Sequence, residues 1–428
     1  MKTPIHTFLS NYAGSGTIRC HMPGGKGKIN PLDITEIDGA DNLYEADGII
    51  RESEELAASL FGAGATLYSC GGSTLVIQGM LALLRELTPK RTIVAGRYSH
   101  KSLINACILL GFDIKWAYPF EFLSGAITSL EIEKLIDSDT AGVFVTSIDY
   151  YGGDCDIAAI SAVCAENNVP LLVDNAHGAY RVFTKNHPMA LGADMCADSA
   201  HKTLPALTGA AYLHLKDGSL RDEAKRAMAL FGSSSPSYPI MDSLDLCNPF
   251  IDGRLAAAVG AVHNIAVLKG WLSDSGFTLK KSDPMRITID TAAYGYEGQD
   301  FAHLLRKAGA ECEMADENYV VLLFSPYQNE TDLMKLYKML KTIPICVPID
   351  VPPHEILRPK KRLAPREAYF SPKKTVSVDN ALGKICAGVH SPCPPCVPIV
   401  MPGEVICESC LRELFRHDVK EICVVDER

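Results

Sequence analysis

Short runs of consecutive apolar residues alternate with segments of helical periodicity between about residues 62 and 216. Apolar runs rich in β-branched residues occur at 92–96 (TIVAG) and 141–148 (AGVFVTSI), among others. Longer segments lie between such runs and predict helices, as in LVIQGMLALLREL at 75–87. Strands that are buried on both faces and separated by helices are typical of a parallel or mostly parallel sheet. The pattern therefore predicts an α/β fold for this region.

A second alternation of strands and helices follows at 285–343 and predicts a small separate α/β lobe. The Pro-rich segment 348–374 has no apolar periodicity and indicates a linker or an extended arm. A chain of 428 residues is too long for one ordinary core. We therefore predict four parts: an N-terminal arm at 1–50, a large domain at 51–250, a small α/β domain at 251–345, and a linker with a C-terminal domain at 346–428.

The composition excludes several classes of function. A net charge of −10 argues against nucleic acid or an anionic membrane as a partner and mildly favours a small cationic substrate. The apolar segment 255–272 is interrupted by His263, Asn264 and Lys269, so we expect a buried helix and no membrane span. The first residues lack the apolar core of a signal peptide, and the 15 cysteines suit reduced thiols. We expect a cytoplasmic protein.

Four predicted strands are followed by residues that can carry chemistry. In open α/β sheets, ligands bind outside the carboxyl ends of the strands. Ser73 and Thr74 follow a Gly-Gly turn and could form a phosphate site at a helix N-terminus. His100, Asp174 and Lys202 each come directly or shortly after an apolar strand. Each of these residues also has an ordinary structural interpretation, as a helix cap, a turn residue or a core side chain.

Together, the four places match the needs of pyridoxal 5′-phosphate (PLP). A lysine forms the Schiff base, a buried carboxylate keeps the pyridine nitrogen protonated, an imidazole can lie on the ring, and a helix N-terminus can bind the phosphate. Of two lysines that follow a histidine, we favour Lys202, which comes 28 positions after Asp174 at the next strand end. Lys101 is expected to be a solvated or substrate-side residue.

The chain resembles the prokaryotic ornithine/lysine/arginine decarboxylase family of fold-type-I PLP enzymes, in its short form without an N-terminal wing domain. The resemblance covers nearly the whole chain and rests on segments that include HMPGGKG at 21–27, VDNAHGAY at 173–180, DSAHKT at 198–203 and CPPCVPIVMPGE at 393–404. Three residues depart from the usual pattern of the family: Gly25, Asn175 and Gly209.

The resemblance implies a role for each matching residue. Lys202 would form the Schiff base, Asp174 would pair with the ring nitrogen, and His100 would stack on the ring. His177 would lie beside the cofactor, and Ser234 would reach the phosphate bound by a neighbouring subunit. The side chains that would bind or neighbour the phosphate are Ser73, Thr74, Ser199 and His201.

The implied reaction is decarboxylation of arginine, lysine or ornithine in polyamine biosynthesis, by a homodimer or higher homo-oligomer. Lys202 or His201 would return a proton to the α-carbon after carbon dioxide leaves. The alternatives are another fold-type-I reaction, such as transamination or β-elimination, and a decarboxylase-like protein that only binds or regulates a partner. The residues do not decide which basic amino acid is the substrate.

A CxxC…CxxC spacing in the tail provides a competing interpretation. Cys393, Cys396, Cys407 and Cys410 could together form a four-thiolate zinc site. The first pair is CPPC, in which two prolines stiffen the loop that would have to fold around a metal ion. We therefore predict that these cysteines hold no metal.

Overall fold

The computed structural model of the chain describes residues 1–123, 125–392 and 397–426. Contacts between residues divide the chain into two compact units. The first unit contains residues 1–92, 136–147 and 157–255, and the second contains residues 93–135, 148–156 and 256–428. The four domain boundaries expected from the sequence stay a prediction.

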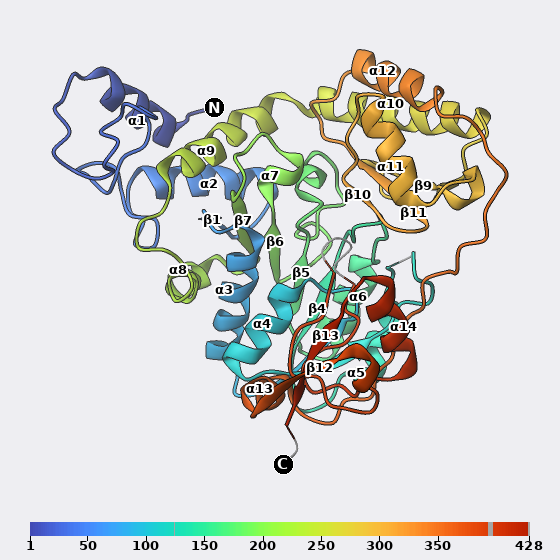
Figure 1. Ribbon diagram of the computed structural model, residues 1–428. Coiled ribbons are helices and arrows are strands. Elements are labelled where there is room, and N and C mark those ends of the chain that lie inside the picture. Colours follow the sequence, from blue (N-terminus) through green and yellow to red (C-terminus); the bar gives the residue numbers. More distant parts are fainter. Residues whose placement is uncertain (124, 393–396, 427–428) are drawn as a thin grey trace. The chain divides into compact units, whose positions relative to one another are not determined.

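A seven-stranded sheet has the strand order β1-β7-β6-β5-β4-β2-β3 (Figure 1). Neighbouring strands β4, β5 and β6 are parallel, whereas β7 runs antiparallel to both β6 and β1. The predicted, mostly parallel α/β sheet is confirmed. Its strands are β1 (Ala65–Ser69), β2 (Thr92–Gly96), β3 (Asp113–Ala117), β4 (Thr140–Thr146), β5 (Leu171–Asp174), β6 (Met195–Asp198) and β7 (Ala211–Leu215).

Every residue of β1, β5, β6 and β7 is buried, because helices of the first unit cover these strands. Helices α3 and α8 pack side by side, as do α2 and α9 (Figure 1). Gly79 allows the close approach of α3 and α8, since a Cβ atom there would lie 2.6 Å from Cγ of Met228. The helices of this unit are α1 (Pro4–Gly14), α2 (Ile49–Phe61), α3 (Gly72–Leu87), α6 (Ile157–Glu166), α7 (Ala200–Thr203), α8 (Arg221–Ala229) and α9 (Tyr238–Gly253).

The second unit contains a four-stranded antiparallel sheet in the order β10-β11-β9-β8. The strands and helices expected at 285–343 are present within it. The strands are β8 (Leu279–Lys280), β9 (Arg286–Asp290), β10 (Met314–Ala315) and β11 (Tyr319–Leu323). The helices up to this point of the unit are α4 (Lys101–Leu110), α5 (Ser129–Leu135), α10 (Leu255–Asp274), α11 (Gly298–Lys307) and α12 (Glu330–Leu340).

Helix α10 corrects one expectation, because only one of its faces is buried. The buried residues recur every three or four positions, as on the inner face of a surface helix: Ala258, Ala261, Ile265, Leu268 and Leu272. Leu255 and Val259 on other faces are 54% and 55% exposed. By length and composition alone, α10 is the one helix among the described residues that could cross a membrane.

The last part of the chain has its own small core. Strands β12 (Lys373–Ser377) and β13 (Glu421–Val425) pair antiparallel, and they accompany helices α13 (Pro365–Phe370) and α14 (Glu408–Arg416). Helix α14 buries Cys410 and Leu414 in a cluster with apolar side chains of β13 and the preceding loops. Short 3₁₀ helices complete the chain at Ala179–Phe183, Gly218–Leu220, Ala292–Tyr294 and Val378–Asn380.

Candidate active site

The carboxyl ends of β5 and β6 lie next to each other. The two strands are parallel, and Asp174 at the end of β5 pairs in register with Ala197 of β6. After β6 the chain passes through Ser199 directly into the short helix α7, which carries Lys202. The parallel register therefore brings Asp174 and the lysine-bearing turn to one edge of the sheet.

Lys202, His177 and Asp174 form the centre of this site. The Nζ atom of Lys202 lies 2.7 Å from Nε2 of the buried His177. Oδ1 of Asp174 accepts a hydrogen bond of 3.1 Å from the Ala176 amide. Burial raises the pKa of the Asp174 carboxyl, although the Ala176 amide and the nearby Lys202 ammonium act in the opposite direction. Asp174 is thus a buried carboxylate whose charged form a cationic ligand would stabilise.

Ser73 and Ser199 meet at the N-terminus of α3. The Ser199 hydroxyl donates a 2.9 Å hydrogen bond to Oγ of Ser73, although the two residues are 126 positions apart. Gly72 begins α3 with φ of +66°, and nothing lies within 4 Å of the position that its Cβ would occupy. The N-terminus of α3 and the adjacent Ser199 therefore offer two hydroxyls, with open space at Gly72, an arrangement that suits a phosphate group.

Thr74 and His201 are close in sequence to Ser73 and Ser199. Nδ1 of His201 donates a 2.9 Å hydrogen bond to the carbonyl oxygen of Ala210. Burial lowers the pKa of His201, so its imidazole is neutral near pH 7. Thr74 is exposed on the first turn of α3.

His100 belongs to the second unit, where it caps helix α4. Its Nδ1 accepts a 3.2 Å hydrogen bond from the amide of Ser102 and lies 2.8 Å from the Ser102 hydroxyl. Because Nδ1 accepts from an amide, the ring proton of the neutral imidazole is on Nε2. The capping role of His100 fixes the orientation of its ring, and the adjacent Lys101 is exposed.

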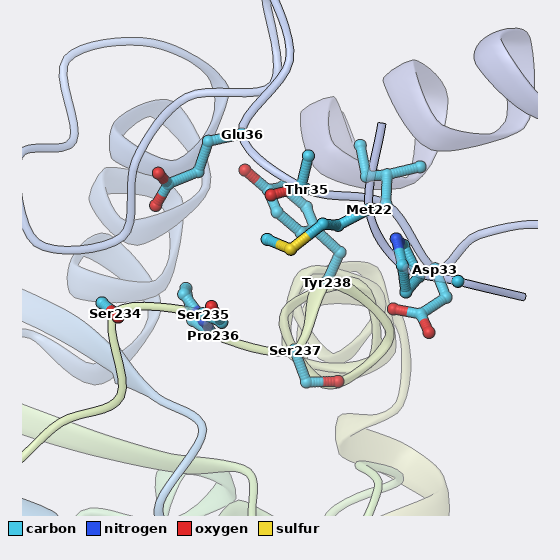
Figure 2. Close-up of a pocket in the computed structure, with 12 residues that line it drawn as sticks. Met22, Asp33, Thr35, Glu36, Ser234, Ser235, Pro236, Ser237 and Tyr238 are labelled. Atoms are coloured by element: carbon cyan, nitrogen blue, oxygen red, sulfur yellow. The ribbon is translucent and has the colours of Figure 1, made fainter. Parts of the chain in front are cut away.

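Ser234 lines a different cavity, of about 500 Å³, that does not include the other candidate residues. The walls come from the N-terminal arm, including Asp33 and Glu36, and from the loop that leads into α9 (Figure 2). Ser234 itself is exposed. This arrangement leaves its hydroxyl accessible from outside the chain.

A buried network around Asp198 was missed at the level of sequence. One carboxylate oxygen of Asp198 lies 2.9 Å from Nε2 of His187 and 3.3 Å from Nε2 of His214, and the other accepts a 2.7 Å hydrogen bond from Nδ2 of Asn175. Burial alone would raise the pKa of Asp198, but the two imidazoles outweigh it and hold the pKa below its usual range. Asp198 is therefore an ionised carboxylate with three buried hydrogen-bonding partners, and it directly precedes Ser199 in the chain.

Part of this network could have been inferred from the sequence, because Cys196 and Asp198 are two positions apart on one strand and so lie on the same face of the sheet. The antiparallel register that sets His214 beside Cys196 could not be read from the pattern. His187, Cys196 and Asp198 also present metal-ligating atoms within 4.8 Å of one another. The hydrogen bonds from His187, His214 and Asn175 already satisfy the carboxylate without a cation.

The tail cysteines of the zinc alternative are described only in part. Cys393 and Cys396 lie outside the described residues. Cys407 and Cys410 lie at the start of α14, with their sulfur atoms 3.3 Å apart.

Residues 28–259 match the family described as Orn/Lys/Arg decarboxylase, major domain. The chain is 29% identical to the uncharacterized protein YaaO of Bacillus subtilis, over 97% of this chain and 94% of that protein. It is 26% identical to the arginine decarboxylase of Bacillus subtilis over the same shares of 97% and 94%.

Solved structures with the same fold include two lysine decarboxylases. The Francisella novicida lysine decarboxylase LdcF has a TM-score of 0.85 at 16% identity, covering 99% of this chain and 81% of that one. The Escherichia coli constitutive lysine decarboxylase has a TM-score of 0.79 at 18% identity, covering 99% and 82%. A NifS-like protein has a TM-score of 0.58 at 17% identity, covering 71% and 92%.

Proposed function

The chain belongs to the Orn/Lys/Arg decarboxylase family, and from that premise we propose that it removes the α-carboxylate of a basic amino acid as carbon dioxide. It is a PLP-dependent amino acid decarboxylase of fold type I. The observation that carries the proposal is the Lys202–His177 pair beside the buried carboxylate of Asp174. Arginine is the substrate we propose to test first, because the relatives in Bacillus that match over nearly their full length include arginine decarboxylases.

The donor set on this sheet edge fits PLP. The Ser73 and Ser199 hydroxyls at the N-terminus of α3 would hold its phosphate, together with amides of the first turn. Asp174 would pair with its ring nitrogen, and the Lys202 amine would join its aldehyde carbon. Thr74 and His201 would border the phosphate, and the stacking role of His100 stays a prediction from the family resemblance. When bound, PLP supplies a conjugated ring that accepts the electron pair left by the departing carboxylate.

The side chains of the site would prepare and complete this step. His177 would take a proton from Lys202 across their 2.7 Å contact and leave the amine nucleophilic. Asp174 would stay ionised against a cationic ring nitrogen and so stabilise the charge that develops in the transition state. Lys202, or His201 after it has taken up a proton at Nε2, would then deliver the proton that returns to the α-carbon.

The first test supplies purified protein and PLP with arginine, lysine or ornithine in turn. We expect equal amounts of carbon dioxide and the matching amine from one of them, and no keto acid. Lys202→Ala should abolish turnover and the visible absorbance of the lysine-bound cofactor while the far-UV circular dichroism is kept. Lys101→Ala is the matched control and should retain the visible absorbance. Keto acid production would indicate a transaminase, and absence of bound PLP would indicate a binding protein.

We further propose that the active unit is a homodimer or higher homo-oligomer in the cytoplasm. The exposed Ser234 on the rim of the arm cavity supports a contact with a phosphate held by a second copy. The described cysteines are free thiols, which suits a reducing compartment. Light scattering during dilution should show that dissociation and PLP release occur together, since a shared site links the two equilibria. A monomer with full activity and bound PLP would refute the shared site.

A further inference from the structure

Helix α14 begins with the segment CESC at 407–410, which places two cysteines at its N-terminus. Cys407 is the N-cap residue, and Cys410 is the third residue of the helix. Side chains at these two positions approach each other, as they do in a capping box. The two sulfur atoms accordingly lie 3.3 Å apart. A disulfide requires about 2.05 Å, so closing this pair needs a shift of only about 1 Å.

The two thiols differ in their access to solvent. Cys407 is partly exposed, whereas Cys410 is fully buried in the core of the C-terminal region. The Sγ atom of Cys410 lies 3.7 Å from the carbonyl oxygen of Ile399, which forms part of the same core. A reactant from solution can therefore reach Cys407 and cannot reach Cys410 directly.

The surroundings of the two thiols also make their pKa values differ. Burial would raise the pKa of Cys407, but hydrogen bonds from the Ser409 hydroxyl and from the Cys410 and Ser409 amides outweigh it and lower the pKa. Burial raises the pKa of Cys410 to about 12. A thiolate at a helix N-terminus beside a second, protonated thiol is the arrangement that dithiol exchange uses.

A buried ion pair and a backbone hydrogen bond hold the segment before α14 in place. Glu404, three residues before Cys407, accepts hydrogen bonds of 2.5 and 3.0 Å from the two terminal nitrogens of Arg97. The same carboxylate accepts a 2.8 Å hydrogen bond from the Met401 amide, and both charged side chains are buried. This ion pair fixes the backbone that leads into α14, so the relative position of the two thiols is preorganised.

We propose that Cys407 and Cys410 form a thiol–disulfide exchange site that reacts with small-molecule disulfides. In the first step, the Cys407 thiolate attacks one sulfur of the reagent, a mixed disulfide forms, and the second sulfur leaves as a thiolate. In the second step, the sulfur of Cys410 attacks Sγ of Cys407, and the first half of the reagent leaves as a thiol that carries the proton of Cys410. The protein dithiol is oxidised, and the reagent is reduced to two thiols.

Cys386, in the same core, is fully buried, and its sulfur lies 3.1 Å from the carbonyl oxygen of Gly388. The metal-ligating cluster found among the described residues is the one around Asp198 and contains neither Cys407 nor Cys410. Zinc held by Cys407 and Cys410 is the competing occupant, and it would block the exchange reaction.

The test treats reduced, PLP-loaded enzyme with oxidised glutathione and maps the products by mass spectrometry of peptides. We expect a Cys407–Cys410 disulfide in the wild type. Cys410→Ser should stop at a stable glutathione adduct on Cys407, because the resolving thiol is absent. Cys407→Ser should leave Cys410 unmodified, and the matched control Cys386→Ser should still form the disulfide. The rate should reach half its maximum below pH 8.5, the ordinary thiol value, because the attacking group is the thiolate.

Three outcomes would overturn the proposal. The first is glutathione on the exposed Cys20 or Cys346 with none on Cys407. The second is an adduct on Cys407 in the wild type that never resolves to the disulfide. The third is stoichiometric zinc in the purified enzyme that is lost in Cys407→Ser, with exchange only after chelation.

Discussion

Replacing Asp198 by alanine should destabilise the first unit more than any exposed substitution nearby. The carboxylate is fully buried and lies within hydrogen-bonding distance of His187, His214 and Asn175. Removing it leaves three buried donors without their acceptor, and each unsatisfied buried group costs about 1–3 kcal/mol. A change of tautomer in the histidines recovers part of this cost, so we expect a loss of about 3–5 kcal/mol in the free energy of unfolding.

The assay is thermal unfolding of wild type and variant, followed by far-UV circular dichroism. For a unit of about 200 residues, 1 kcal/mol corresponds to roughly 2–4 °C, so Tm should fall by roughly 6–20 °C. Asp194→Ala is the matched control, because its half-exposed carboxylate contacts Lys216 at 3.4 Å and the Leu171 amide. It should cost about 1 kcal/mol.

The pH dependence gives an independent check on Asp198. Its folded pKa lies below its unfolded value, so its contribution is present above about pH 4 and is lost as the pH falls through the folded pKa. The gap in Tm between wild type and Asp198→Ala should therefore narrow below about pH 4. An Asp198→Ala variant whose Tm at neutral pH equals that of Asp194→Ala would refute the stabilising role of the Asp198 carboxylate.

Three further predictions concern other buried charges and the tail. Asp174→Asn should retain PLP but lower turnover by orders of magnitude, since an amide cannot stabilise a protonated ring nitrogen; near-normal turnover in a steady-state assay would contradict its role. Burial raises the pKa of Asp149 to about 7, so its ionisation reduces stability as the pH rises from about 4 to about 7, and Asp149→Asn should raise stability at pH 8 by up to about 4 kcal/mol in chemical denaturation. The purified protein should contain no stoichiometric zinc by elemental analysis, because we propose that Cys407 and Cys410 act as thiols; zinc retained in Cys407→Ser would point to a metal site elsewhere.

The alternation of apolar and polar residues determined the main elements of the large sheet. Apolar runs such as TIVAG at 92–96 indicate strands covered on both faces, and the longer, nearly continuous apolar segment before that run indicates the buried helix α3. Helix α8 was not predicted, because its sequence is strongly polar overall. Its buried face packs against α3.

The site residues also divide into those that the sequence indicates and those that only the fold brings together. Lys202, Asp174 and Ser73 could be named from the sequence because each follows a strand, and the ends of parallel strands meet at one edge. The 2.9 Å contact between Ser73 and Ser199 depends on the strand order, which places β7 between β1 and β6 and which no local pattern encodes. The same holds for Asp198, His187 and His214, because buried polar groups become partners only when the fold brings distant segments together. The sequence by itself determined which chemistry is available, whereas the tertiary structure decided which side chains share it.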